Sequence, residues 1–100
     1  MPLGADEADP EAELRRLVER WRQLPLDVAT ARLPLVRDHI QGLADRSARL
    51  AGHPAAPVPD LGPAVAADQL RVMVHDVVRR AGDVDRADVA ARLRGLRAQL

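Results

Sequence analysis

The residues best suited to chemistry in this 100-residue chain are two histidines that each adjoin an aspartate, Asp38-His39 and His75-Asp76. Imidazole and carboxylate groups are good ligands for zinc or iron, so convergence of the two pairs would make a metal-binding helical bundle that uses His39 and His75. Neighbouring residues on a helix point about 100° apart, however, so one pair cannot easily turn both groups inward. The Glu-x-x-His motif of bundle di-metal sites is also absent from the sequence. We therefore expect solvated histidines, no metal and no cofactor.

Groups for covalent catalysis are scarce. Cysteine is absent, Thr30 is the single threonine and Ser47 the single serine. An activated nucleophile needs an adjacent base, and neither hydroxyl group has that setting. The sequence also has no glycine-rich phosphate loop and no zinc-ligand spacing. It therefore predicts a protein that is not an enzyme and has no catalytic residues.

Arginines near the end of the chain raise the alternative of nucleic-acid recognition. The last two predicted helices could form a DNA-binding helix-turn-helix whose second helix carries the arginines. Acidic side chains cluster at the end of that helix that would enter the groove, where they would repel phosphates. DNA binding thus stays an alternative, and we expect a partner other than nucleic acid. The arginines are Arg86, Arg92, Arg94 and Arg97, and the acids are Asp83, Asp85 and Asp88.

Four stretches of the chain have apolar side chains at every third or fourth residue, which is the pattern of amphipathic helices. Their ends follow from capping residues, prolines and glycines. The first helix begins at Asp9-Pro10 and stops at Pro25, the second begins at Asp27 and ends before Gly52, the third runs from Pro63 to Ala81, and the fourth has Asp85 as its N-cap and reaches Leu100.

Prolines interrupt this pattern in two places. Pro34 lies inside the second stretch, where proline either kinks or breaks a helix; the unbroken apolar seam favours the kink. Residues 52–63 contain four prolines and two glycines, so we expect an extended crossover that could pass over the end of the bundle.

Together these elements predict an all-α fold, an antiparallel four-helix bundle with a Pro-kinked second helix and a Pro-rich crossover loop. Residues 9–100 would form this helical bundle domain, and residues 1–8 a mobile acidic N-terminal arm. No apolar run approaches the roughly 20 residues of a membrane span, and the start of the chain does not resemble a signal peptide. We therefore expect a cytoplasmic protein with no membrane partner, and the codon bias implied by the composition is typical of a GC-rich bacterial genome.

The core has few large side chains, because the sequence lacks Phe and Tyr and has one Trp. A second copy could supply the missing burial. Trp21 occupies an apolar-seam position, so it is either a core residue or an interface anchor. Val65 and Val72 lie a heptad apart on the polar side of their helix, which hints at a second contact surface. The sequence thus predicts a non-enzymatic helical protein–protein interaction module, self-associating or adaptor, with Trp21, Val65 and Val72 at the interface of a homodimer or higher oligomer.

Overall fold

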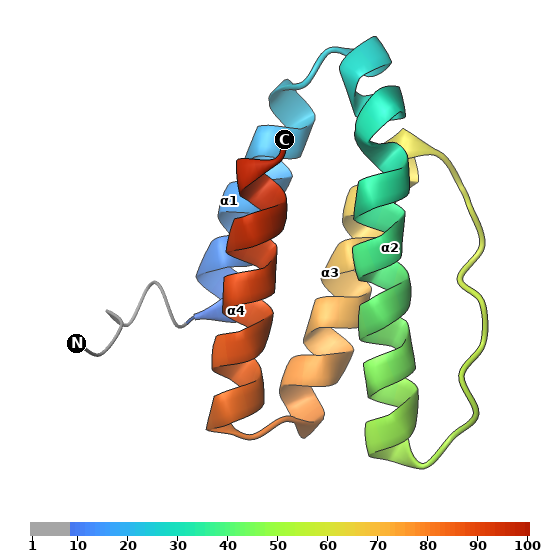
Figure 1. Cartoon of the computed structure of the whole chain (residues 1–100), viewed down its shortest axis with the longest axis vertical. Helices are drawn as coiled ribbons and strands as arrows, with labels where there is room; N and C mark the ends of the chain where they lie inside the picture. Colours follow the sequence, from blue (N-terminus) through green and yellow to red (C-terminus); the bar gives the residue numbers. More distant parts are fainter. Residues whose placement is uncertain (1–8) are drawn as a thin grey trace.

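The computed structural model describes residues 9–100, which contain four helices and no strand. This part of the chain confirms the predicted all-α four-helix bundle (Figure 1). The predicted mobile acidic arm, residues 1–8, lies outside the described residues. None of the described helices combines the length and apolar character that crossing a membrane requires. The helices are α1 (Pro10–Gln23), α2 (Leu26–Ala51), α3 (Pro63–Arg80) and α4 (Asp83–Ala98).

The directions of the helices follow from the long crossover. In Figure 1, α1 runs upward, α2 returns downward, residues 52–62 climb back beside α2, α3 runs downward and α4 runs upward. The short connections therefore join helices of opposite direction, as the sequence predicts. The crossover instead makes α2 and α3 parallel, and α1 and α4 parallel. These two parallel pairs have the most extensive contacts in the bundle, which is the arrangement of a bundle with one long crossover.

Polar side chains of α2 hold the crossover in place. The Gln41 amide donates to the carbonyl of Ala56 at 3.0 Å and accepts from the backbone N–H of Val58 at 2.8 Å. The Arg37 guanidinium donates to the Val58 carbonyl at 3.0 Å and lies 3.9 Å from the Asp60 carboxylate. The crossover therefore follows the side of α2 rather than the end of the bundle.

Two features of the helix ends confirm the sequence prediction. The Asp9 side chain caps α1 by accepting a hydrogen bond from the backbone N–H of Glu11 at 3.0 Å. Gly52 ends α2 in the left-handed region with a φ of 72°, which glycine adopts without steric cost. Between these points, α2 continues through Pro34 without a break. The kink at this proline stays a prediction.

The predicted start of the second helix at Asp27 and the predicted N-cap of the fourth at Asp85 are both wrong. Pro25 is the residue before α2, so Asp27 lies inside the first turn. Gly82 is the residue before α4, so Asp83 and Asp85 both lie inside its first turn. Negative charge is favourable anywhere in the first turn of a helix, because the helix dipole is positive there. An acid near a helix start therefore does not by itself identify the cap.

Aliphatic side chains of all four helices meet in one core. Trp21 belongs to this core, with 6% of its surface exposed, and its indole N–H donates to the carbonyl of Pro63 at 3.0 Å. This hydrogen bond ties the end of α1 to the start of α3. Among the most deeply buried core residues are Leu17, Ile40, Leu70, Val74, Val77, Val89, Leu93 and Leu96.

Candidate functional site

The structure does not bring the two histidines together. His39 is partly buried on α2 in a groove beside α4, where its Nδ1 lies 3.1 Å from the carbonyl oxygen of Leu35. His75 is exposed on α3 in a different groove, beside α1. Within residues 9–100, no three histidine or carboxylate side chains gather as metal ligands would. The geometry therefore gives the metal hypothesis no support.

The three predicted interface residues lie in different environments. Trp21 is a core residue, which answers the question that the sequence left open. Val65 is partly buried near the start of α3. Val72 is 53% exposed on the same helix, as the helical pattern predicts. Of the three, Val72 is thus the side chain most accessible to a second molecule.

The arginines of the predicted helix-turn-helix are largely engaged inside the molecule. Arg92 forms an ion pair with Asp88 at 2.9 Å, on the same helix. Arg94 and Arg97 lie 3.7 Å and 3.4 Å from the carboxylate of Glu13 on α1. These contacts leave less uncompensated charge for DNA phosphates than the sequence suggests.

A groove separates α2 from α4. The two helices contact each other sparsely, and a space of about 350 Å³ remains between them. Leu43, Val89 and Leu93 provide its apolar floor, and Gly42 widens it because glycine has no side chain. The polar rim consists of Asp38, His39, Asp45, Arg46, Arg49 and Arg92. We call this space the α2–α4 groove.

One carboxylate links the two walls of the α2–α4 groove. Asp88 on α4 accepts hydrogen bonds from Arg46 on α2 at 2.7 Å and from Arg92 at 2.9 Å. The two guanidinium groups hold the pKa of Asp88 below its usual range, because they stabilise the ionised carboxylate. The second terminal nitrogen of Arg46, Nη1, is buried without a hydrogen-bond partner among the described residues.

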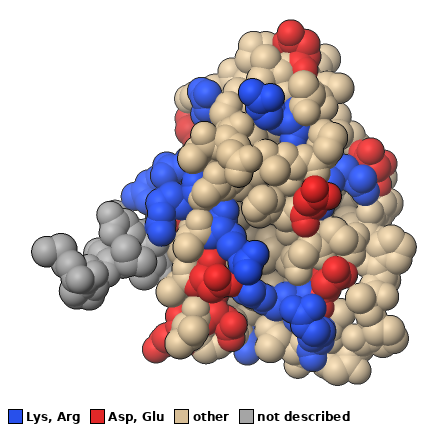
Figure 2. Space-filling model, in the orientation of Figure 1, with Lys and Arg blue, Asp and Glu red and all other residues tan. Residues whose placement is uncertain are grey.

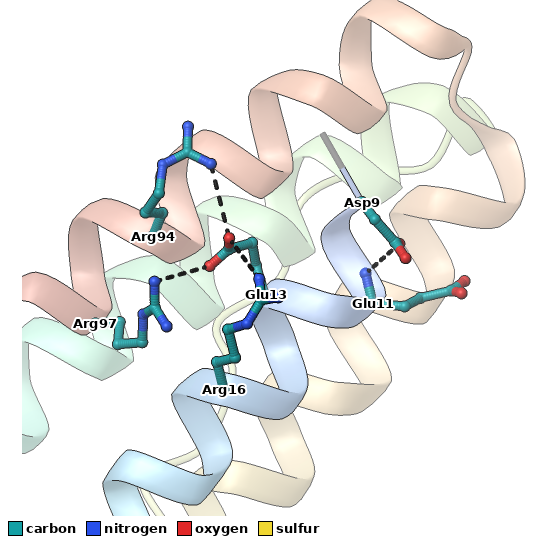
Figure 3. A network of polar contacts seen from close by, with 6 residues as sticks. All are labelled: Asp9, Glu11, Glu13, Arg16, Arg94 and Arg97. Atoms are coloured by element: carbon teal, nitrogen blue, oxygen red, sulfur yellow. Dashed lines mark hydrogen bonds and ion pairs between the residues drawn. The ribbon is translucent and has the colours of Figure 1, made fainter. Parts of the chain in front are cut away.

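On the other side of α4, three arginines surround a buried carboxylate (Figure 3). Glu13 on α1 is 1% exposed, and its Oε1 lies 3.1 Å from Arg16 and 3.7 Å from Arg94. The second oxygen, Oε2, lies 3.4 Å from Arg97. A buried carboxylate is tolerated only when opposite charges compensate it, and the arginines do so here.

Glu13 is the residue that the sequence interpretation missed. Its place in the first turn of α1 by itself indicates only a favourable interaction with the helix dipole. The spacing carries a further signal. Glu13 precedes Leu17 by four residues and therefore lies on the apolar face of the helix. A charged residue at such a position indicates a buried partner, which the sequence cannot identify.

A second groove, of about 490 Å³, opens beside this cluster, between α1 and α4. Four arginines and one glutamate line it, and the Arg20 guanidinium donates to the carbonyl oxygen of Leu100 at 3.1 Å. We call this space the α1–α4 groove. Its lining residues are Arg16, Glu19, Arg20, Gln23, Arg94, Arg97 and Ala98.

Basic side chains gather in a diagonal band across the face of the molecule that carries α2 and α4 (Figure 2). The two grooves on either side of α4 contribute seven arginines in all. We call these seven residues the arginine band: Arg16, Arg20, Arg94 and Arg97 in the α1–α4 groove, and Arg46, Arg49 and Arg92 in the α2–α4 groove.

A scan against protein-family models found no match to this chain, and searches of the curated proteins and of the solved structures found none either. The fold and the surface therefore define the class of protein: a small four-helix bundle with an arginine-lined groove on each side of its last helix.

Proposed function

We propose that this protein is a non-catalytic binding module that holds an acidic, amphipathic helical segment of a partner protein in the α2–α4 groove. The observation that carries the proposal is an apolar floor between α2 and α4. These two helices line the same groove but contact each other sparsely. Apolar grooves between helices are a common receptor for the apolar face of another helix.

The dimensions of the groove suit a short helical segment. Its α2 wall extends from Asp38 to Arg49, which is about three helical turns. A bound helix would place apolar side chains one turn apart along this length. These side chains would contact Leu43 and Leu93 on the floor.

The charge around the groove favours an acidic segment. Arg49 and Arg92 lie on the rim, and the arginine band continues beyond α4. Carboxylates on the polar face of the bound segment would pair with these guanidinium groups. The unsatisfied Nη1 of Arg46 adds a donor, because a buried polar group without a partner gains from any acceptor that reaches it.

The test is a titration with designed helical peptides. Binding is monitored through the backbone amide NMR resonances of α2 and α4. One peptide has apolar residues along one face and glutamates on the other; a second has lysines in place of the glutamates. We expect the acidic peptide to shift resonances around Leu43 and Leu93. Equal binding of the basic peptide would contradict the proposal.

A matched pair of glycine variants locates the binding site. A Cβ at Gly42 or at Gly95 meets no atom within 4 Å, so a side chain can begin at both positions without a clash. Gly42 lines the groove and Gly95 does not. We expect Gly42→Leu to weaken peptide binding at least about tenfold, or roughly 1.4 kcal/mol, and Gly95→Leu to leave it unchanged. Equal affinities of the two variants would place the peptide elsewhere.

The partner can also be a second copy of the chain, as a self-associating module requires. Sedimentation at micromolar concentration separates this case from an adaptor that binds another protein. A dimer that Gly42→Leu dissociates would show that a second copy occupies the α2–α4 groove. A monomer that binds the acidic peptide would identify an adaptor.

A further inference from the structure

We infer that the α1–α4 groove is a binding site for a phosphoryl dianion, carried either by a small organic phosphate or by a phosphorylated side chain. The inference concerns the opposite side of α4 from the α2–α4 groove and does not depend on what binds there. It rests on how the arginines are held, on the charge they contribute and on the size of the space.

Glu13 holds three of the arginines in position. Its buried carboxylate lies within 3.1–3.7 Å of Arg16, Arg94 and Arg97. Three of the four lining guanidinium groups are therefore anchored from the inside of the bundle. Each of these three side chains is still between 33% and 40% exposed. Side chains that are already ordered lose little further freedom when a ligand binds.

The side chains that line the groove favour an anion. Among the described residues, the lining arginines number four, and the glutamates that line or adjoin the groove are Glu13 and Glu19. Among these side chains, the positive groups outnumber the negative ones. A phosphoryl group carries about −1.5 to −2 charges near neutral pH and presents three oxygens. Guanidinium groups match that geometry through paired hydrogen bonds.

The space is larger than a free phosphate ion needs. About 490 Å³ falls within the range of roughly 300–1,000 Å³ typical of ligand sites. Gln23 and Ala98 also line the groove. These groups would contact the body that carries the phosphoryl group, and so favour a phosphate ester over the bare ion.

The test titrates the protein with three probes: inorganic phosphate, a phosphoserine peptide, and the same peptide with glutamate in place of phosphoserine. Binding is monitored through the backbone amide and arginine side-chain NMR resonances of the protein. We expect both phosphoryl probes to shift resonances of α1 and the end of α4, and the glutamate peptide to bind more weakly. Tighter binding of the phosphopeptide than of inorganic phosphate would favour a protein-borne phosphoryl group, and equal binding a small phosphate ester. Equal affinity of the glutamate peptide and the phosphopeptide would overturn the inference.

Two substitutions outside the Glu13 cluster test the site without disturbing the core, since Arg20 and Glu19 are both exposed. Arg20→Gln removes one donor, so we expect inorganic phosphate to bind about threefold to tenfold more weakly. Glu19→Gln removes a competing carboxylate, so we expect binding about twofold to fivefold tighter.

The matched control is Arg79→Gln, an exposed position on α3 that makes the same change in net charge but does not line the groove. Its phosphate affinity should equal that of the unmodified protein. Equal weakening by Arg79→Gln and Arg20→Gln would show a general charge effect and overturn the inference. An unchanged phosphate affinity in both Arg20→Gln and Glu19→Gln would also overturn the inference.

Discussion

α4 contacts both α1 and α2, and its packing against these two helices differs. Against α1 it packs closely, and the polar groups there surround the buried carboxylate of Glu13. Against α2 it packs sparsely, and the link between the two walls is Asp88, whose side chain is 41% exposed. In each case one carboxylate meets arginines from two helices. The comparison shows that burial, rather than residue type, decides what such a cluster contributes.

The physical reason is the surrounding dielectric. A carboxylate in contact with water is screened, so the Asp88 ion pairs contribute little to stability. A buried carboxylate interacts strongly with its partners and is costly when they are missing. Glu13 therefore fixes the position of α1 on α4, whereas Asp88 leaves α2 and α4 free to remain apart and keep a groove between them.

The largest expected effect is that of Glu13→Gln, which keeps the shape of the side chain and removes its charge. The three arginines would then lose the carboxylate that they share. We expect a loss of about 2–4 kcal/mol in the free energy of unfolding, somewhat below the usual value for a broken buried ion pair, because the arginines are partly exposed. Urea denaturation measures this loss. A change below about 0.5 kcal/mol, typical of surface substitutions, would mean that burial does not distinguish the two clusters.

Asp88→Asn, on the other side of α4, should cost less than about 1 kcal/mol at neutral pH. The pKa of Asp88 is lowered in the folded state, so its contribution is present above the unfolded value of about 3.9. It is lost as the pH falls through the lowered pKa. Urea denaturation at several pH values should show a constant difference between the variant and the unmodified protein above about pH 5, narrowing below about pH 4. A difference that grows in acid would contradict the prediction.

Gly42→Ala should stabilise the protein by about 0.5–1 kcal/mol, because alanine in a helix interior costs less backbone entropy than glycine. Gly95→Ala on α4 should have the same effect, since a Cβ at either position meets open space. Thermal unfolding of the two variants measures the gain. A loss of stability at Gly42 alone would indicate that α2 and α4 close together in solution and that the groove is not open.

Val72→Arg should have the smallest effect on stability, within about 0.5 kcal/mol, because the side chain is exposed. The informative measurement for this variant is the mass of its assembly, determined by sedimentation. If the outer face of α3 takes part in self-association, the assembly mass of this variant should be lower than that of the unmodified protein at the same concentration. An unchanged mass would exclude that face and leave the two sides of α4 as the binding surfaces.

The local pattern of the sequence was enough to predict the four helices and most of the core. Leu33, Ile40, Leu70 and Leu93 are all buried in one cluster, as their spacing predicts. The cap at Asp9 and the left-handed Gly52 follow from the same local rules. These features depend on residues within a few positions of one another, so the sequence determines them directly.

The grooves could not be predicted in this way. Glu13 meets Arg94 and Arg97 across more than 80 positions of sequence, and that contact exists because the crossover returns the chain along α2. The path of the crossover in turn depends on Gln41, a polar residue with no distinctive pattern around it. Helical periodicity shows which face of a helix is apolar, but it does not show which helix covers that face. The tertiary structure decides the neighbours, and with them the burial of each charge, because burial depends on all the surrounding chain at once.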